Sequence, residues 1–193
     1  MSKRLMSKNS QNELSKPKKH WSMGLVESMK DADLIYKDSD RIVVIRDKYP
    51  KAKIHFLVLP KENITSIYKL TTKDVALLQE FGEILKMIQI EHKNHHLNAG
   101  FHAVPSMQRL HMHIISKDMV SPCLKTKVHW NSFTTALFKP YNDVLEELKK
   151  YGSIKEVANE EYKTLKSAPL KCNQCSYVPK NIPQLKEHLL THL

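Results

Sequence analysis

Four metal-binding side chains near the C-terminus constrain the fold of this chain more than any other feature. Cys172, Cys175, His188 and His192 follow the spacing C-x2-C-x12-H-x3-H, which is typical of a Cys2His2 zinc site. A short cysteine pair suits a tight turn, and two histidines four residues apart share one face of a helix. We therefore expect residues 171–193 to form a zinc finger with one structural zinc ion, because four protein ligands leave no open coordination position.

The rest of the finger sequence predicts how the module packs and what it can read. Leu185 occupies a usual core position, but Pro179 stands where such fingers usually carry Phe, so we expect Tyr177 or Val178 to fill that space. The helix positions that would read bases are Asn181, Gln184 and Glu187. This set is poor for guanine contacts, which favours binding to the DNA backbone or to DNA ends over sequence-specific recognition.

Length and charge indicate one domain with an appended module and a polyanionic partner. The 193 residues can form one sizeable core. Lys and Arg total 31 against 20 Asp and Glu, and the resulting net charge of +11 favours nucleic acid as the partner. Residues 1–19 hold six basic residues and one acidic residue, Glu13. This segment is expected to be a solvated, disordered tail or to have a DNA-tracking or nuclear-import role, and both can hold together.

Hydropathy and cysteine usage predict the cellular environment. No apolar stretch reaches the roughly 18 residues that span a bilayer, and the N-terminus lacks the apolar centre of a signal peptide. We therefore expect a soluble intracellular protein without membrane contact, and a DNA-directed role makes the nucleus the expected compartment. In a reducing compartment the C-x2-C pair indicates metal rather than a disulfide, which leaves Cys123 as a spare thiol.

The chain before the finger combines strand and helix patterns. The continuously apolar run 54–59 stops at Pro60 and predicts a buried strand. Apolar residues at helical spacing predict a long helix over 72–92, with Thr72 as its N-cap. The other expected elements are a hairpin of strands 33–37 and 41–47, strands over 99–104 and 109–116, a helix over 141–151, and a connector of uncertain structure over 152–170. This order predicts an α+β fold with an antiparallel sheet.

Two histidines share one face of the last of these strands. In an extended segment over 109–116, Arg109, His111 and His113 point to one side while apolar residues point to the other. Three explanations remain open at this point. The histidines are structural, they bind a metal ion together with His55 or His102, or one of them is a catalytic nucleophile.

The segment Arg109-Leu-His111-Met-His113-Ile-Ile resembles the signature of the histidine-triad (HIT) family, His-φ-His-φ-His-φ-φ, where φ is apolar. Further segments are similar to the aprataxin branch of this family. They are His20-Trp-Ser, Asp47-Lys-Tyr-Pro-Lys-Ala-Lys-Ile-His55, Phe101-His102-Ala-Val-Pro-Ser106-Met107, Ser121-Pro-Cys-Leu-Lys125 continuing to His129-Trp-Asn-Ser-Phe133, and the finger's Ile-Pro-Gln-Leu-Lys-Glu-His188. The resemblance covers about residues 20–135 and 171–193, and it implies a HIT-like antiparallel sheet with flanking helices.

The resemblance also implies roles for individual residues. The nucleophile of HIT hydrolases is the middle histidine, which maps onto His111. Arg109 replaces the first histidine, where it would either hold a phosphate oxygen of the nucleotide or point away from the site. The remaining catalytic side chains would be His55, His102 and His113, and the nucleotide would be bound by Asp47 at the ribose and by Ser106 at the α-phosphate. DNA contacts would come from Trp21, as a wedge stacked on the terminal base pair, and from Lys125, Lys127 and His129.

These roles imply a DNA-repair hydrolase that removes AMP from 5′-adenylated DNA ends, the products of abortive ligation. The reaction would pass through a covalent AMP–His111 intermediate without a catalytic metal, with adenylated nicks or ends as the partner and AMP as the product. Two alternatives stay open: a HIT hydrolase of small nucleotides such as AMP-lysine or dinucleoside polyphosphates, and a non-enzymatic DNA-end-binding protein.

The expected domain organisation has four parts. They are a basic tail over 1–19, a HIT catalytic domain over 20–135, a helical connector over 136–170 and the zinc finger over 171–193. From this length we do not expect the forkhead-associated domain that precedes the HIT domain in longer family members.

Overall fold

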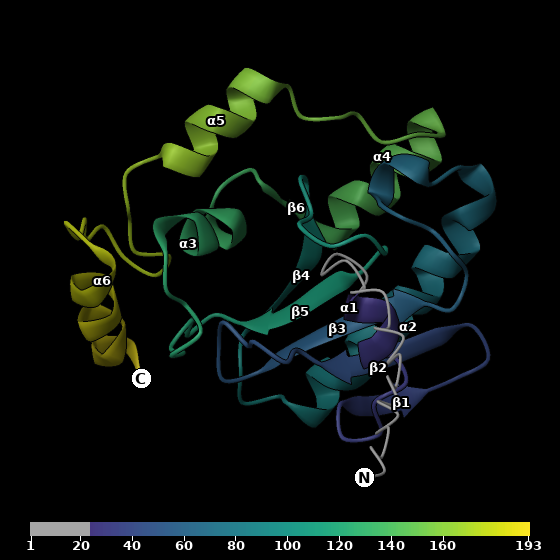
Figure 1. The fold of residues 1–193 in the computed structure, drawn as a ribbon, viewed down its shortest axis with the longest axis horizontal. Coiled ribbons are helices and arrows are strands. Elements are labelled where there is room, and N and C mark those ends of the chain that lie inside the picture. Colours follow the sequence, from purple (N-terminus) through teal and green to yellow (C-terminus); the bar gives the residue numbers. More distant parts are fainter. Residues whose placement is uncertain (1–23) are drawn as a thin grey trace, which may run out of the picture.

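One antiparallel sheet lies at the centre of the computed structural model, which describes residues 24–193 (Figure 1). Its six strands lie in the order β1-β2-β3-β5-β4-β6. Their bounds are β1 Ile35–Asp38, β2 Ile42–Arg46, β3 His55–Pro60, β4 Leu97–His102, β5 Met112–Ser116 and β6 Phe138–Pro140. Every neighbouring pair is antiparallel, which confirms the α+β fold with an antiparallel sheet.

Six α-helices accompany the sheet in the described part of the chain. Their bounds are α1 Gly24–Ser28, α2 Val75–Glu91, α3 Lys127–Thr134, α4 Tyr141–Tyr151, α5 Asn159–Ser167 and α6 Ile182–Leu189. In Figure 1, α3, α5 and the yellow α6 lie toward the side of the picture opposite β1. Among residues 24–193, no helix is both long and apolar enough to cross a bilayer.

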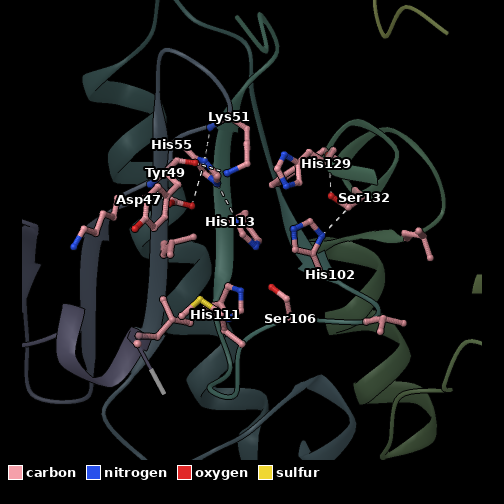
Figure 2. Close-up of a pocket in the computed structure, with 18 of the residues that line it drawn as sticks. Asp47, Tyr49, Lys51, His55, His102, Ser106, His111, His113, His129 and Ser132 are labelled. Atoms are coloured by element: carbon pink, nitrogen blue, oxygen red, sulfur yellow. Dashed lines mark hydrogen bonds and ion pairs between the residues drawn. The ribbon is translucent and has the colours of Figure 1, made fainter. Parts of the chain in front are cut away.

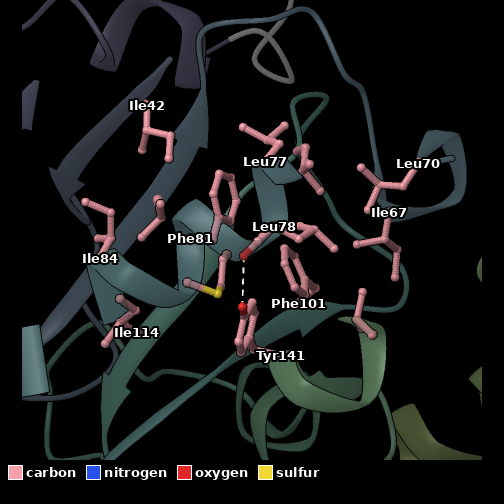
Figure 3. Close-up of a cluster of buried hydrophobic side chains, with 14 of the residues drawn as sticks. Ile42, Ile67, Leu70, Leu77, Leu78, Phe81, Ile84, Phe101, Ile114 and Tyr141 are labelled. Carbon is pink, nitrogen blue, oxygen red and sulfur yellow. Dashed lines mark hydrogen bonds between the residues drawn. The ribbon is translucent and has the colours of Figure 1, made fainter. Parts of the chain in front are cut away.

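Alternation along the strands separates a core face of the sheet from a second face. Even-numbered side chains of β2, β3 and β5, such as Val58, pack with α2 and α4 in the main core. Figure 3 shows Ile42 and Ile114 in this core together with Phe81 of α2. Odd-numbered side chains such as His55 and His113 point to the opposite face, because successive residues of a strand alternate in direction. The histidines therefore lie on the face that α2 and α4 leave open.

Helix α2 lies where its apolar periodicity placed it, but its N-cap is Asp74 and not the expected Thr72. Thr71 forms a capping box with Asp74, which caps the 3-10 turn Thr72–Asp74 before the helix. Within the helix, a Cβ at Gly82 would collide with the Tyr141 hydroxyl. That hydroxyl donates to a backbone carbonyl of α2 at 2.8 Å (Figure 3), so the missing side chain allows α4 to approach α2.

The strand that carries the histidine signature is shorter than its sequence predicts. Strand β5 begins at Met112. The backbone N–H groups of Arg109 and Leu110 instead donate to the carbonyl oxygens of Thr65 and Ile64, at 3.3 and 2.8 Å. Arg109 also has a φ of +150°, a region that non-glycine residues seldom adopt. The alternation expected over 109–116 therefore fails at Arg109.

Three further elements were not individually predicted from the sequence. Helix α3 follows the end of the histidine region, and α5 lies inside the connector. Strand β6 pairs with β4 through Phe101 and Lys139, and so covers an edge of the sheet. The main core continues through α4 to Ile154, well past residue 135.

A separate buried cluster joins the finger to the sheet. Leu185 and Leu189 of α6 pack with Ile115 of β5 and Trp130 of α3. The Trp130 indole N–H donates to the backbone carbonyl of Lys171 at 3.0 Å, directly before the first metal-binding cysteine. The finger and the sheet domain therefore share apolar packing across their boundary.

Two expectations about the finger core have different outcomes. Leu185 is fully buried, as its position predicted. Tyr177 and Val178 are 41% and 62% exposed, so the expectation that they fill the usual Phe position was wrong. Pro179 is itself buried, and the Tyr177 ring stacks on His188 at a centroid distance of 4.1 Å instead.

Candidate active site

A cavity of about 670 Å³ opens on the histidine face of the sheet. Its walls come from α1, the sheet, α3 and α5. The four histidines assigned to catalysis, His55, His102, His111 and His113, all line it. Figure 2 shows Asp47 on one side of His113 and both His102 and His129 on the other. Segments far apart in the sequence thus bring four imidazoles into one site.

His111 has one ring nitrogen tied to the backbone. Its Nδ1 lies 2.7 Å from the carbonyl oxygen of Arg109, and a carbonyl can only accept, so Nδ1 carries the proton and Nε2 carries the lone pair. Burial lowers the pKa of His111, which keeps the ring neutral at pH 7. A neutral imidazole whose Nδ1–H is oriented in this way can act as a nucleophile through Nε2.

His55 and His113 form a chain of hydrogen bonds with a defined direction. The backbone N–H of Lys51 donates to His55 Nδ1 at 3.1 Å, so the neutral His55 ring carries its proton on Nε2. That nitrogen lies 2.9 Å from His113 Nδ1, which accepts the proton, and His113 therefore carries its own proton on Nε2. This last N–H is buried without a partner among the described residues, and it is available to donate to a bound group.

His102 and Asp47 complete the polar lining from opposite sides. His102 Nδ1 donates to the Ser132 carbonyl at 3.1 Å, which leaves its Nε2 as an acceptor. Asp47 accepts a hydrogen bond from the Tyr49 backbone N–H at 2.7 Å, and its other carboxylate oxygen lies 3.5 Å from His55 Nδ1. These contacts hold both side chains in place before any ligand binds.

Burial makes the stability of the protein depend on pH through these histidines. It lowers the pKa of His55 to about 4 and that of His102 to about 3, from an ordinary value of 6.5. Below pH 6.5 the unfolded chain binds protons that the native state does not bind. The free energy of unfolding therefore decreases as the pH decreases. Each such group contributes up to about 1.4 kcal/mol per pH unit between 6.5 and its native pKa. We expect the melting temperature to fall steeply between pH 7 and pH 5.

Substitution of single histidines checks the source of this slope. His102→Gln removes one buried titrating group and should flatten the dependence of the melting temperature on pH. His95→Gln changes an exposed histidine and should leave the slope as it is. An equal slope in all three proteins would show that the buried histidines do not control acid stability.

Lys51 lies at the site although it was not among the residues predicted from the sequence. This lysine lines the cavity, and its ammonium group donates to the Tyr49 carbonyl. Its charge contributes to lowering the pKa values of His55, His102 and His113, after the larger effect of burial. A cation here can offset phosphate charge. The available sequence signal was a lysine four residues before His55 within the quoted family segment.

The structure separates the other expected contacts into two groups. Ser106 and His129 line the cavity, whereas Lys125, Lys127 and Arg109 do not. The Arg109 guanidinium donates to Asn63 Oδ1 at 2.9 Å and to the Lys61 carbonyl at 2.6 Å. It therefore holds the loop after β3 instead of facing a nucleotide. Trp21 lies outside the described residues.

Helix α3 links the cavity to the finger through two different faces. Its residues His129, Ser132 and Phe133 line the cavity. Trp130 and Asn131, each 1% exposed, point into the protein and contact the connector and the start of the finger. The expected connector also reaches the site, because Tyr162 of α5 lines the same cavity.

The finger residues fit a tetrahedral metal ion. Cys172 Sγ lies 3.5 Å from His192 Nε2, Cys175 Sγ lies 3.1 Å from His188 Nε2, and the two histidine Nε2 atoms are 3.1 Å apart. Zinc bonds of typical length at tetrahedral angles put such ligand atoms about 3.3–3.6 Å apart. The donor set and its spacing therefore suit structural zinc.

A second group offers metal ligands inside the cavity. Asp47, His55 and His113 place ligand atoms within 4.8 Å of one another. In the described structure two of these side chains are bonded to each other, through His55 Nε2 and His113 Nδ1. This hydrogen bond occupies one ring nitrogen of each histidine.

Two family models together cover almost the whole chain. The model described as "Scavenger mRNA decapping enzyme C-term binding" matches residues 20–129. The model described as "C2HE / C2H2 / C2HC zinc-binding finger" matches residues 134–193. The second match begins well before the finger, in α3, and so includes β6, α4 and α5.

Curated relatives and solved structures agree with these matches. Aprataxin from Danio rerio is 46% identical over 90% of this chain and 54% of its own length. An aprataxin-like protein from Schizosaccharomyces pombe is 30% identical over 81% of this chain and 73% of its own length. The crystal structure of the aprataxin ortholog Hnt3 in complex with DNA has a TM-score of 0.68 at 25% identity, over 89% of this chain and 92% of the other.

The chain spans about half the length of the vertebrate and tunicate relatives that it matches. The similarity nevertheless extends through both the histidine-bearing sheet and the finger, in one order along the chain. The chain therefore belongs to the aprataxin family.

Proposed function

We propose that this protein is a hydrolase that removes AMP from 5′-adenylated DNA ends, and that His111 is its nucleophile. The observation that carries the proposal is the state of His111. Its ring is neutral, and a backbone carbonyl holds its proton on Nδ1. Its Nε2 therefore carries a lone pair, in a cavity large enough for a nucleotide. A family relative crystallised in complex with DNA supports DNA as the substrate class.

The chemistry follows from the hydrogen bonds of the site. His111 Nε2 attacks the adenylate phosphorus, and the bond from that phosphorus to the DNA 5′-phosphate oxygen breaks, so the DNA leaves with its phosphate. The ring becomes positively charged, which strengthens the Nδ1–H bond to the Arg109 carbonyl. Water then attacks the same phosphorus, the P–N bond breaks, AMP leaves and one proton is released.

Other cavity residues suit the charge that develops on phosphorus. The unpartnered Nε2–H of His113 can donate to a phosphate oxygen, and the Lys51 ammonium lies at the same cavity. These groups are in place before the substrate binds. They perform the charge stabilisation that the reaction requires, so the proposed mechanism uses no catalytic metal, and the finger zinc has a structural role only.

Apolar residues of the cavity suit a nucleoside. Leu25, Ile45, Leu57 and Met107 give the cavity an apolar wall that fits a base, and the Asp47 carboxylate can accept hydrogen bonds from ribose hydroxyls. Ser106 lines the cavity close to His111 (Figure 2), where we assign it to the α-phosphate.

Other parts of the proposal rest on resemblance and charge. Trp21 is the proposed wedge at the terminal base pair. Residues 1–19, with their excess of basic side chains, are the proposed route to DNA and to the nucleus. Lys125, Lys127 and His129 are the proposed backbone contacts on the finger side of the cavity.

A direct experiment decides between this function and its alternatives. The protein is incubated with a 5′-adenylated nicked duplex and, separately, with AMP-lysine, and the 5′ end and the free AMP are measured. Faster turnover of the duplex, by kcat/KM, is the expected result. Turnover of AMP-lysine alone would identify a hydrolase of small nucleotides. Binding of the duplex without turnover of either substrate would identify a non-enzymatic DNA-end-binding protein.

A further inference from the structure

An aromatic side chain of α5 reaches the cavity from the connector. Tyr162 lines the cavity on the same side as Val128 and Phe133 of α3. Its helix is held in place by a buried amide: Asn131, 1% exposed, donates from Nδ2 to the carbonyl oxygens of Lys166 and Ala168 at 3.0 and 2.9 Å. The position of the Tyr162 ring is therefore determined by packing between α3 and α5 and not by a loose linker.

A positive charge accompanies this ring. The Lys166 ammonium lies 5.3 Å from the centroid of the Tyr162 ring. Lys166 is absent from the ion pairs within residues 24–193, whereas Lys163 on the same helix is paired with Glu160. An aromatic ring beside an unpaired cation is the combination that binds nucleic-acid strands, by stacking on a base and attracting the backbone.

The place of Tyr162 in the cavity indicates which part of the substrate it meets. Residues of α1, β2 and β3 line the cavity as the proposed nucleoside wall, and residues of α3 and α5 line it as well. In Figure 2, Asp47 lies to one side of His111, and His129 and Ser132 of α3 lie to the other side in this view. With AMP at the nucleoside wall, the group on the far side of the scissile bond extends toward α3 and α5.

We propose that Tyr162, together with Lys166, is a binding site for the polynucleotide leaving group and makes the enzyme prefer adenylated strands over small AMP conjugates. This inference rests on the proposed function. The ring stacks on the base or sugar next to the 5′-phosphate, and the ammonium attracts the backbone. A small conjugate such as AMP-lysine is too short to contact Tyr162 and Lys166, so these residues do not increase its affinity.

The test uses Tyr162→Ala and Tyr162→Phe in the full chain. Tyr151→Ala is a matched control, because Tyr151 is an exposed tyrosine on α4 with Lys150 4.8 Å from its ring centroid, and it does not line the cavity. Fluorescence anisotropy measures affinity for a nicked duplex with a plain 5′-phosphate. Steady-state kinetics measure kcat/KM on the adenylated duplex and on AMP-lysine, and thermal melting monitors folding.

Tyr162→Ala is expected to lower affinity for the duplex, and kcat/KM on the adenylated duplex, by about tenfold, which is what one base–aromatic stack is worth. AMP-lysine hydrolysis and the melting temperature should not change. Tyr162→Phe keeps the ring and should behave as wild type, as should Tyr151→Ala. Lys166→Gln should reduce the slope of log affinity against log salt concentration by about one, and Lys150→Gln should not.

Two results would overturn the inference. Equal losses on the duplex and on AMP-lysine would make Tyr162 a structural part of the cavity wall, and unchanged affinity for the duplex would show that the ring does not touch the strand. If the wild-type protein releases no AMP from the adenylated duplex, the proposed function is wrong. The affinity measurements on the unadenylated duplex still decide the role of Tyr162 in that case.

Discussion

Replacing His111 by Ala is expected to abolish AMP release from adenylated DNA and from AMP-lysine alike, and to leave affinity for DNA intact. The side chain forms a bond to phosphorus in the proposed reaction, and its only hydrogen bond among the described residues is to the neighbouring Arg109 backbone. Loss of a covalent nucleophile lowers kcat by more than about a hundredfold. Acid quenching of the wild-type protein should trap protein-linked AMP, and the variant should trap none.

Two further variants separate chemistry from folding in this experiment. His111→Asn fills more of the buried space than Ala and should be equally inactive, with a melting temperature closer to wild type. His95→Ala removes an exposed histidine and should retain full activity. If His111→Ala retains more than about a hundredth of the wild-type turnover, another residue is the nucleophile.

The second large effect is expected from removal of the finger metal. Cys172→Ala or His188→Ala should lower the zinc content from one ion per chain to none, measured by elemental analysis, and should unfold α6, because such modules fold on their metal. Loss of the finger should weaken DNA binding by at least about tenfold, since it removes a whole contact surface. Hydrolysis of AMP-lysine should survive, because the proposed catalytic residues His55, His102 and His113 lie on β3, β4 and β5, and His111 directly precedes β5.

The third cysteine of the chain supplies the control. Cys123→Ala removes a free thiol that lies outside the metal-binding cluster, and it should change neither zinc content nor activity. The buried cluster around Trp130 contains residues of both the finger and the sheet domain, so a different result is also informative. If AMP-lysine hydrolysis falls together with DNA binding, then packing of the finger on α3 supports the cavity, and finger and sheet form one cooperative unit.

Local patterns in the sequence determined the elements that depend on near neighbours. The four finger ligands follow from spacing alone, because a turn and one helical repeat bring them together. The long helix α2 and the buried strand β3 follow from apolar periodicity and length. Helix α3, with a mixed composition, gave no such signal, and its N-terminus at Thr126 is evident only from the side-chain bond to the His129 backbone N–H.

The histidine signature identified the site but not all of its members. His55, His102, His111 and His113 line one cavity as expected. Strand alternation brings His55, His102 and His113 to the same face of β3, β4 and β5, and His111 directly precedes β5. The same alternation was extended to Arg109 and failed there. Its backbone pairs with Thr65, and its side chain bonds to the loop after β3, which are contacts that sequence spacing does not encode.

The sequence by itself therefore determined the zinc ligands through their local spacing and the strands and helices through their periodicity. Its resemblance to the HIT signature and to the companion family segments identified the four histidines. Only the tertiary structure decided the protonated nitrogen of each histidine, the place of Lys51 and the approach of Tyr162 to the cavity. Those features depend on which distant segments pack together, as when Asn131 fixes the end of α5. Such packing is determined by shape and burial across the whole core, and a single sequence shows neither.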